Sequence, residues 1–229
     1  MEFDISNKNL WTVFEIGGQK VYITQSIFTT WVVMAVLIGF SLFIRSKVKS
    51  FKDVPSGIQT LLEMAVDAID GLVKGVMGDK MPYLSGYFFS VFAFILVSNY
   101  SSVLGVRPPT SDLATTLPLA LNTFVFIHFA GVTKQKGKYF KEYLKPFFIF
   151  LPVNIISEIS RPVSLGFRLF GNILGGLILG AVIYAIPVFM RFAIPSVIHL
   201  WFDVAVGALQ SFVFTMLSIT FISLKAETD

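Results

Sequence analysis

The residues best suited to chemistry lie in residues 157–176, which read SEISRPVSLGFRLFGNILGG. Arg161 and Arg168 stand there inside an apolar run that continues from Phe147 to Phe189. An ionisable side chain at the centre of a bilayer costs about 2.5–3.5 kcal/mol on insertion scales, so such residues commonly serve an ion or substrate pathway. The chemistry indicated by the two arginines is therefore the handling of charge within an apolar segment.

Helical spacing places these arginines on one polar stripe. Residues three and four apart share a helix face, and the stripe consists of Asn154, Glu158, Arg161, Leu165, Arg168, Asn172 and Gly175. A polar stripe with glycine at its edge faces protein or water in a membrane and avoids lipid.

The two arginines differ in their surroundings. Arg168 has no acid within four residues of its own segment, and Gly166 and Gly171 leave room beside it. Its counter-ion is therefore expected on another element or another subunit. For Arg161, beside Pro162, two interpretations stay open: a buried structural pair, for example with Asp203, or a place in the pathway.

A second polar stripe lies near the C-terminus. His199, Asp203 and Gln210 follow at steps of four and seven, so an α-helix places them on one face. Two neighbouring helices with such stripes would bury them against each other or against a third partner.

Composition indicates an integral membrane protein. Of 229 residues, 55% are hydrophobic and 14% are charged, against about 25% charged in soluble domains. The net charge of +4 does not indicate nucleic acid, because the cations stand at the ends of apolar runs. Without cysteine the chain has no disulfide and no thiolate metal site. The N-terminus lacks the basic and apolar regions of a cleaved signal peptide.

The predicted fold is an all-α integral membrane protein with about five membrane helices and one interfacial amphipathic helix, in a single membrane domain of residues 1–229. An external lead-in, residues 1–23, contains a Gly17-Gly18 turn. The membrane helices are expected at 24–44, 83–105, 114–133, 146–188 and 195–225, the last two long and tilted as a hairpin. The interfacial helix is expected at 53–79, with a charged stripe of Glu63, Asp67, Asp70 and Lys74.

Cation placement selects this topology. Residues 45–52 and the loop from Lys134 to Lys145 are rich in lysine, which places both in the cytoplasm, the N-terminus outside and the C-terminus inside. This arrangement holds if residues 56–78 do not span and if residues 147–189 form one long tilted helix. Two spans that turn near Arg161-Pro162 would leave Lys225 outside.

Two strings resemble subunit a of F-type ATP synthases: RPVSLGFRLFGN at 161–172 and LQSFVFTMLSITF at 209–221. The resemblance extends over the whole chain. It implies a bacterial cell-membrane stator subunit that forms two aqueous half-channels and passes H⁺ or Na⁺ to and from the c-ring. The implied partners are the c-ring, the b subunits of the peripheral stalk, the remainder of the synthase and membrane lipid, with no nucleic acid and no cofactor.

The resemblance also implies roles for single residues. Arg168 matches the essential arginine that faces the c-ring carboxylate, Asn172 the asparagine one turn on, and Gln210 the glutamine near the arginine. Glu158 matches an acid in one half-channel. Many members have a glutamate where this chain has Leu177, so the external half-channel must use other groups, for which the candidates are Asp203, His199, Asn122 and Asp112.

The remaining polar residues are expected to be structural. Asn154 and Arg161 are the structural polar residues of the first stripe, and His128 is expected to be a packing or interfacial histidine. No nucleotide-binding loop is found, so the chain is not expected to be an enzyme on its own. A self-contained transporter of an anionic substrate is the alternative, although such proteins usually contain paired repeats, which are not apparent here. A structural scaffold would not need Arg168. The coupling ion stays open.

Overall fold

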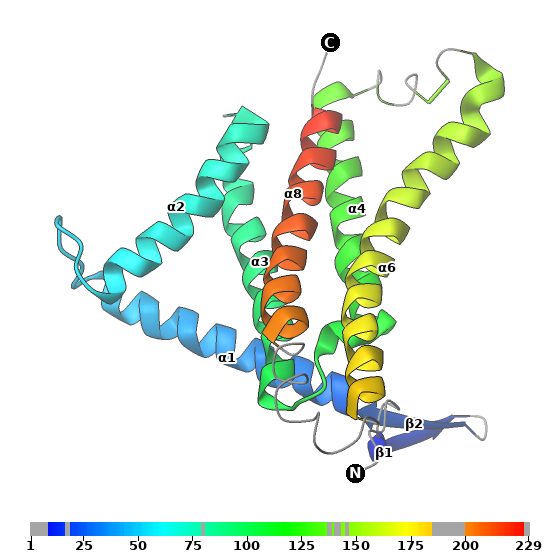
Figure 1. Cartoon of the computed structure of the whole chain (residues 1–229). Coiled ribbons are helices and arrows are strands. Elements are labelled where there is room, and N and C mark those ends of the chain that lie inside the picture. The colour runs from blue at the N-terminus through cyan, green and yellow to red at the C-terminus, as the bar shows by residue number, and fades with distance from the viewer. Residues whose placement is uncertain are drawn as a thin grey trace. The chain divides into compact units, whose positions relative to one another are not determined.

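The computed structural model describes residues 9–16, 19–78, 81–136, 139, 143–144, 147–184 and 200–226. Helices make up most of these residues (Figure 1). The long ones are α1 (Gln25–Val48), α2 (Ile58–Met77), α3 (Ser85–Tyr100), α4 (Leu113–Gln135), α6 (Leu151–Tyr184) and α8 (Gly207–Ala226).

Five helical segments are long and apolar enough to cross a membrane. They are Gln25–Val48, Ser85–Leu104, Leu113–Gln135, Phe148–Val182 and Trp201–Ala226. The predicted helical fold class with five membrane helices is therefore confirmed, and α2 is not one of the five.

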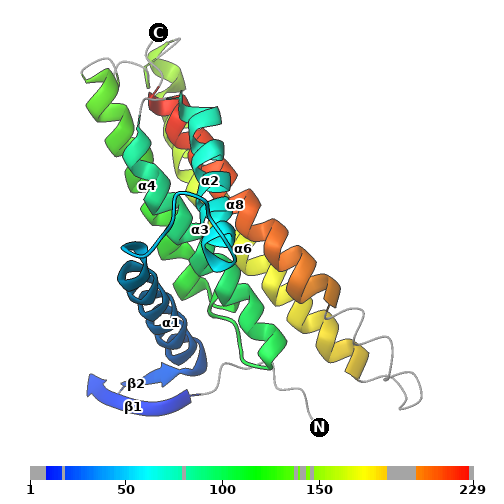
Figure 2. The same cartoon turned by 90° about the vertical axis from the view of Figure 1, so that its left-hand side faces the viewer.

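A short β-hairpin precedes the helices, where the sequence suggested only an exposed lead-in. Strands β1 (Asn9–Ile16) and β2 (Gln19–Thr24) pair antiparallel, with Ile16 opposite Gln19 (Figure 2). Both strands are rich in aromatic and β-branched residues, which suit a pleated strand. Polar residues stand between these strand-favouring residues, so the strand pattern is not evident in the sequence.

Helix α6 settles the question of the long apolar run. It is one helix of 34 residues, so the chain does not turn near Arg161. Pro162 lies inside it and cannot donate a backbone hydrogen bond to the carbonyl of Glu158. Such a proline is tolerated in a membrane helix when neighbouring groups satisfy the carbonyl it frees.

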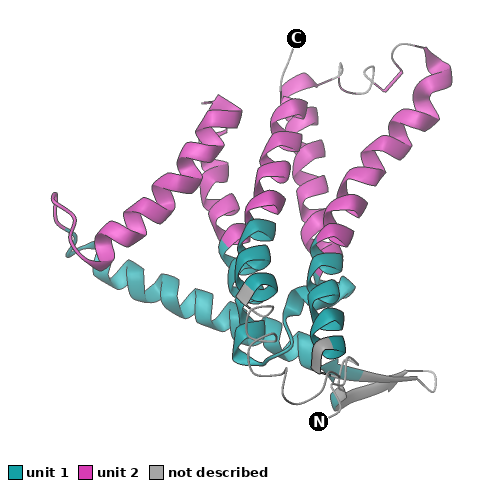
Figure 3. Ribbon diagram, viewed as in Figure 1, with its two compact units in different colours: residues 1–51, 93–115, 169–211 teal, residues 52–92, 116–168, 212–229 magenta. Residues whose placement is uncertain are grey.

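Two compact units divide the chain (Figure 3). Unit 1 comprises residues 1–51, 93–115 and 169–211, and unit 2 comprises residues 52–92, 116–168 and 212–229. Helices α3, α4, α6 and α8 each pass from one unit into the other.

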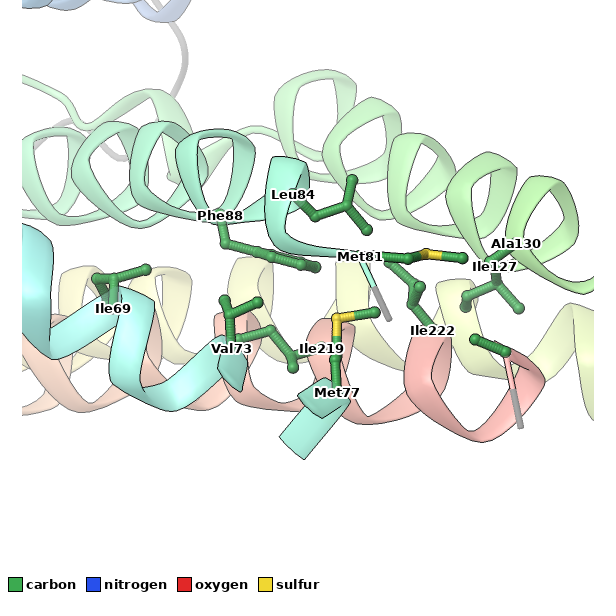
Figure 4. Packing of buried hydrophobic residues seen from close by; sticks show 11 residues of the cluster. Ile69, Val73, Met77, Met81, Leu84, Phe88, Ile127, Ala130, Ile219 and Ile222 are labelled. Atoms are coloured by element: carbon green, nitrogen blue, oxygen red, sulfur yellow. The ribbon is translucent and has the colours of Figure 1, made fainter. Parts of the chain in front are cut away.

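Unit 2 is built around the apolar face of α2. Ile69, Val73 and Met77 recur every four residues and are at most 5% exposed. They pack against Phe88 of α3 and Ile219 of α8, together with Met81, Leu84, Ile127, Ala130, Ile222 and Ala226 (Figure 4). A helix whose flank is buried in this way is fixed to its neighbours mainly by packing.

The charged stripe of α2 lies beside this core. Lys74 Nζ is 2.6 Å from Asp70 Oδ2, and the Ser85 hydroxyl donates to Asp70 Oδ1 at 2.7 Å. These hydrogen bonds, that of Lys74 first, lower the pKa of Asp70 below its ordinary value of 3.8. Because the pKa is lowered in the folded state, the stabilisation is complete above 3.8 and is lost as the pH falls below it.

Truncation of Met77 tests the packing of α2. Met77→Ala is expected to lower the free energy of unfolding by about 2–5 kcal/mol, because the side chain is 1% exposed and its removal leaves a cavity. Met64 on the same helix is 62% exposed, so Met64→Ala is the matched control and should change stability little. Denaturant unfolding of the purified protein measures both. Equal losses would contradict the packing described.

Candidate functional site

The rotation of α6 about its own axis decides where Arg168 points. A Cβ added at Gly166 would lie 3.2 Å from Leu117 Cδ2 and 3.5 Å from the Thr116 carbonyl oxygen, so α6 approaches α4 closely at this glycine. Successive residues of an α-helix are about 100° apart, so Arg168 points away from α4. The expectation that Gly166 makes room for Arg168 is therefore wrong, because its space is taken by α4.

Arg168 is an exposed cation on a helix of membrane-spanning character. Leu165 and Leu169 of α6 are at most 2% exposed, whereas Phe167, next to Arg168, is 51% exposed. Across the described ranges, the structure gives Arg168 no hydrogen bond and no ion pair. Its charge is thus available to a group outside this part of the chain.

Asn172 and Gln210 meet within unit 1, as two packed polar stripes would require. Asn172 Nδ2 donates to Gln210 Oε1 at 2.6 Å. Gln210 is 4% exposed, and its Nε2 is buried without a hydrogen-bond partner among the residues described. A buried donor left unsatisfied costs about 1–3 kcal/mol, so this amide suits an acceptor such as a water molecule or a carboxylate.

Glu158 forms the centre of a charged cluster in unit 2. Its Oε1 is 2.9 Å from Lys225 Nζ, and its Oε2 accepts a hydrogen bond from Arg161 Nη1 at 3.1 Å. The Glu158 and Lys225 side chains are 8% and 10% exposed. The observed partner of Arg161 is thus Glu158, one turn away on α6, and not Asp203. Arg161 Cζ also lies 5.5 Å from the centre of the Phe221 ring.

Lys225 is a site residue that sequence reasoning missed, because it served there only to mark the orientation of the C-terminus. Its Nζ lies 5.3 Å from the ring centre of Tyr143 and 5.7 Å from that of Tyr139. Gln135 Nε2 donates to its carbonyl oxygen at 3.2 Å. Lys225 therefore connects the end of α8 to α6 and to the residues that follow α4. The only indication of Lys225 in the sequence was its place at the end of the last apolar run.

A buried polar network around Asn99 in unit 1 was also missed. Asn99 Nδ2 donates to the Gly207 carbonyl oxygen at 2.9 Å, and the Thr110 hydroxyl donates to Asn99 Oδ1 at 2.7 Å. The Ser211 hydroxyl donates to the same Gly207 carbonyl at 2.9 Å. Asn99, Thr110 and Ser211 are fully buried. An asparagine within an apolar span was the available signal.

The network lies where α8 begins. The preceding residues, Leu200–Val206, form a π-helical segment, η7. The turn of a π-helix is wider than that of an α-helix, so the 100° spacing from which a common face of Asp203 and Gln210 was predicted does not apply at Asp203. Asp203 is half-buried in this segment, and His199 lies outside the described residues.

The other predicted site residues make contacts of their own. Asp112 precedes α4, and its Oδ1 accepts from the Ala114 backbone N–H at 3.0 Å, which is a helix-capping role. Asn122 is exposed on α4. Asn154 Nδ2 donates to the Tyr143 carbonyl oxygen at 2.8 Å, and His128 Nδ1 lies 3.0 Å from the Phe124 carbonyl oxygen. Within the described ranges, no three His, Cys, Asp or Glu residues gather as metal ligands.

Comparison with known proteins adds an independent observation. Residues 27–223 match the family described as "ATP synthase A chain". The chain is 34% identical to chloroplastic ATP synthase subunit a of Stigeoclonium helveticum, with 93% of this chain and 89% of the relative aligned. It is 33% identical to ATP synthase subunit a of Mycobacterium ulcerans (90% and 88% aligned) and 32% identical to that of Moorella thermoacetica (92% and 94% aligned).

A double-mutant cycle tests the buried pair in unit 2. Glu158→Gln and Lys225→Gln are each expected to lower the free energy of unfolding by about 3–5 kcal/mol, because each leaves a buried charge with one partner fewer. The double variant should lose less than the sum, with a coupling energy of about 0.5–3 kcal/mol. The more exposed Asp70–Lys74 pair is the matched control and should give a smaller coupling. Strict additivity at Glu158 and Lys225 would contradict the contact.

Replacement of Asn99 tests the network in unit 1. Asn99→Leu removes the acceptor of Thr110 and a donor to Gly207, so it is expected to destabilise the protein by about 1–3 kcal/mol. Asn122→Leu, at an exposed position, is the control and should be close to neutral. Thermal unfolding in detergent measures both variants. An equal effect at the two positions would remove the case for a buried network.

Proposed function

Because the chain belongs to the ATP synthase A chain family, we propose that it is the stator subunit that passes H⁺ or Na⁺ to and from the carboxylates of the c-ring. As a member of this family, the chain is an ion-translocating, multi-pass subunit of the synthase membrane sector. It is a component of the complex and not a nucleotide-binding catalytic subunit.

The observation that carries the proposal is the exposed charge of Arg168. A cation on an apolar helix needs a counter-ion, and the described part of the chain supplies none to this guanidinium. A carboxylate that moves past on a neighbouring ring would meet that need for part of each turn.

The chemistry follows from the fixed charge. An opposite charge within about 4–6 Å favours the ionised form of a carboxylate, so Arg168 would make a passing ring carboxylate release its H⁺ or Na⁺. Arginine stays protonated in any protein environment, which lysine does not. The same positive charge repels a cation that would cross directly between the two half-channels, so ions must travel with the ring.

Asn172 and Gln210 are proposed to assist Arg168. Asn172 follows Arg168 by one helical turn, and its hydrogen bond fixes the Gln210 side chain. The buried Nε2 of Gln210 can donate to a water molecule or to a carboxylate. This donor supports a polar path along Asn172 and Gln210.

The rest of the ion path is assigned by charge and place in the chain. We assign Asp112, Asp203, Asn122 and His199 to the external half-channel, in place of the glutamate for which this chain has Leu177. Glu158 is assigned to the other half-channel, with Arg161 and Asn154 as structural polar residues. Since both Glu158 oxygens contact cations, it suits a fixed charge beside the path better than a proton carrier.

The orientation is proposed from the lysine-rich segments. The N-terminus would lie outside and the C-terminus in the cytoplasm of a bacterial cell membrane, with the b subunits of the peripheral stalk as further partners. An elementary charge that crosses about 100 mV releases about 2.3 kcal/mol. Many such steps would drive rotation.

Substitution of Arg168 tests the proposal. Membrane vesicles that contain the assembled complex with Arg168→Ala are expected to lose ATP-driven acidification or Na⁺ uptake and to leak ions passively, because the fixed charge no longer discharges the ring or blocks the direct path. Arg45→Ala, an exposed arginine at the end of α1, is the control and should pump normally. Normal pumping by an assembled Arg168→Ala complex would overturn the proposal.

A further inference from the structure

A cavity of about 470 Å³ lies in unit 2 beside the first half of α6. Phe124 and His128 of α4 form one wall, Leu151 and Ile155 of α6 form another, and Tyr139 and Tyr143 contribute aromatic rings. Cavities of about 300–1,000 Å³ are typical of ligand sites. Of the residues assigned to the ion path above, only Glu158 lines this cavity, and its carboxylate is held by Arg161 and Lys225.

Close contacts hold the walls of the cavity in place. The ring of Tyr139 packs directly over Gly131 of α4, where an added Cβ would clash with it. The hydroxyls of Tyr139 and Tyr143 are 2.6 Å apart, and Asn154 of α6 donates to the Tyr143 carbonyl oxygen. Because these contacts join α4, the two tyrosines and α6, the cavity does not close by simple side-chain rotation.

The lining suits a hydrocarbon chain better than water. Most of it is aliphatic or aromatic, and its polar groups have partners within the protein. The tyrosine hydroxyls bond each other, His128 Nδ1 pairs with the Phe124 carbonyl oxygen, and the Glu158 carboxylate is held by two cations. A water molecule needs two to four polar partners to be held in place, and these open, apolar walls offer few.

The sequence around the cavity is strongly basic. Lys134 and Lys136 are exposed at the end of α4, and residues 134–145 contain five lysines and one acid. Lysine clusters next to a membrane span attract anionic lipid headgroups, and tyrosines mark the headgroup level of a bilayer. An apolar cavity whose α4 wall leads to the exposed Lys134 and Lys136 is complementary to a molecule with an acyl chain and a negative head.

We propose that this cavity holds an acyl chain of an anionic phospholipid whose phosphate lies against the lysines at the end of α4. The inference requires that the chain spans a membrane at this place and does not depend on the ion path. A zwitterionic lipid offers the same chain without the net charge, and free phosphate offers the charge without the chain. Both are therefore expected to bind weakly.

Lipid retention by the purified ATP synthase complex tests this site. The complex is washed in detergent, incubated with dioleoyl phosphatidylglycerol or dioleoyl phosphatidylcholine, and the lipid kept by this subunit is counted by native mass spectrometry. The expected result is a clear preference for phosphatidylglycerol that excess inorganic phosphate does not abolish. Equal retention of the two lipids, or displacement by phosphate alone, would overturn the proposal.

Two pairs of variants locate the lipid. Ile155→Trp fills the cavity and should reduce phosphatidylglycerol retention about tenfold, whereas Ile156→Trp, at the next and more exposed position outside the lining, should retain it. Lys134→Gln with Lys136→Gln should reduce retention about fivefold per lysine, and Lys47→Gln with Lys49→Gln at the end of α1 should not.

Unchanged retention in Ile155→Trp, or equal losses in its control, would assign the lipid to the general membrane surface. The Arg168→Ala complex should keep the lipid even though it does not pump. A failure of this inference is thus separate from a failure of the proposed function.

Discussion

Charge inside apolar helices has to be neutralised, and this constraint governs the structure. In unit 2 it is met internally, since Glu158 is held between Arg161 of its own helix and Lys225 of α8. Arg168 differs from Glu158, because the described residues give it no hydrogen bond and no ion pair. The same helix therefore carries one charged group that fixes it to the protein and another, Arg168, for which we propose a partner on the c-ring.

The position of each functional group follows from close helix packing. Gly166 lets α6 approach α4, and this contact sets the rotation that turns Arg168 outward. Gly207 plays a comparable part in unit 1, where a Cβ would lie 3.1 Å from Asn99 Cβ. There the Asn99 amide satisfies the Gly207 carbonyl at the junction between a π-helical and an α-helical segment. The lack of a side chain at Gly166 and Gly207 thus allows the close contacts that fix where the nearby polar side chains lie.

Properties that depend on neighbours in sequence could be predicted, and those that depend on tertiary contacts could not. The apolar runs predicted the five membrane helices, and the charged stripe of α2 separated it from them. Helical spacing placed Glu158 and Arg161 on one face, but the third member, Lys225, is far along the chain and carries no local signal. Asn99 looked like an isolated polar residue because its partners lie on other elements. The assumption of regular α-helical spacing failed at η7, since a π-turn leaves no clear mark in composition.

Among the described residues, no atom lies within 4 Å of a Cβ added at Gly171 or Gly175 of α6. Packed helices normally interlock, with side-chain ridges of one in the grooves of the other, and this fixes their crossing angle. At these two glycines α6 has no ridge to engage. A helix laid against these two glycines could therefore approach the α6 backbone more closely than interlocked side chains allow.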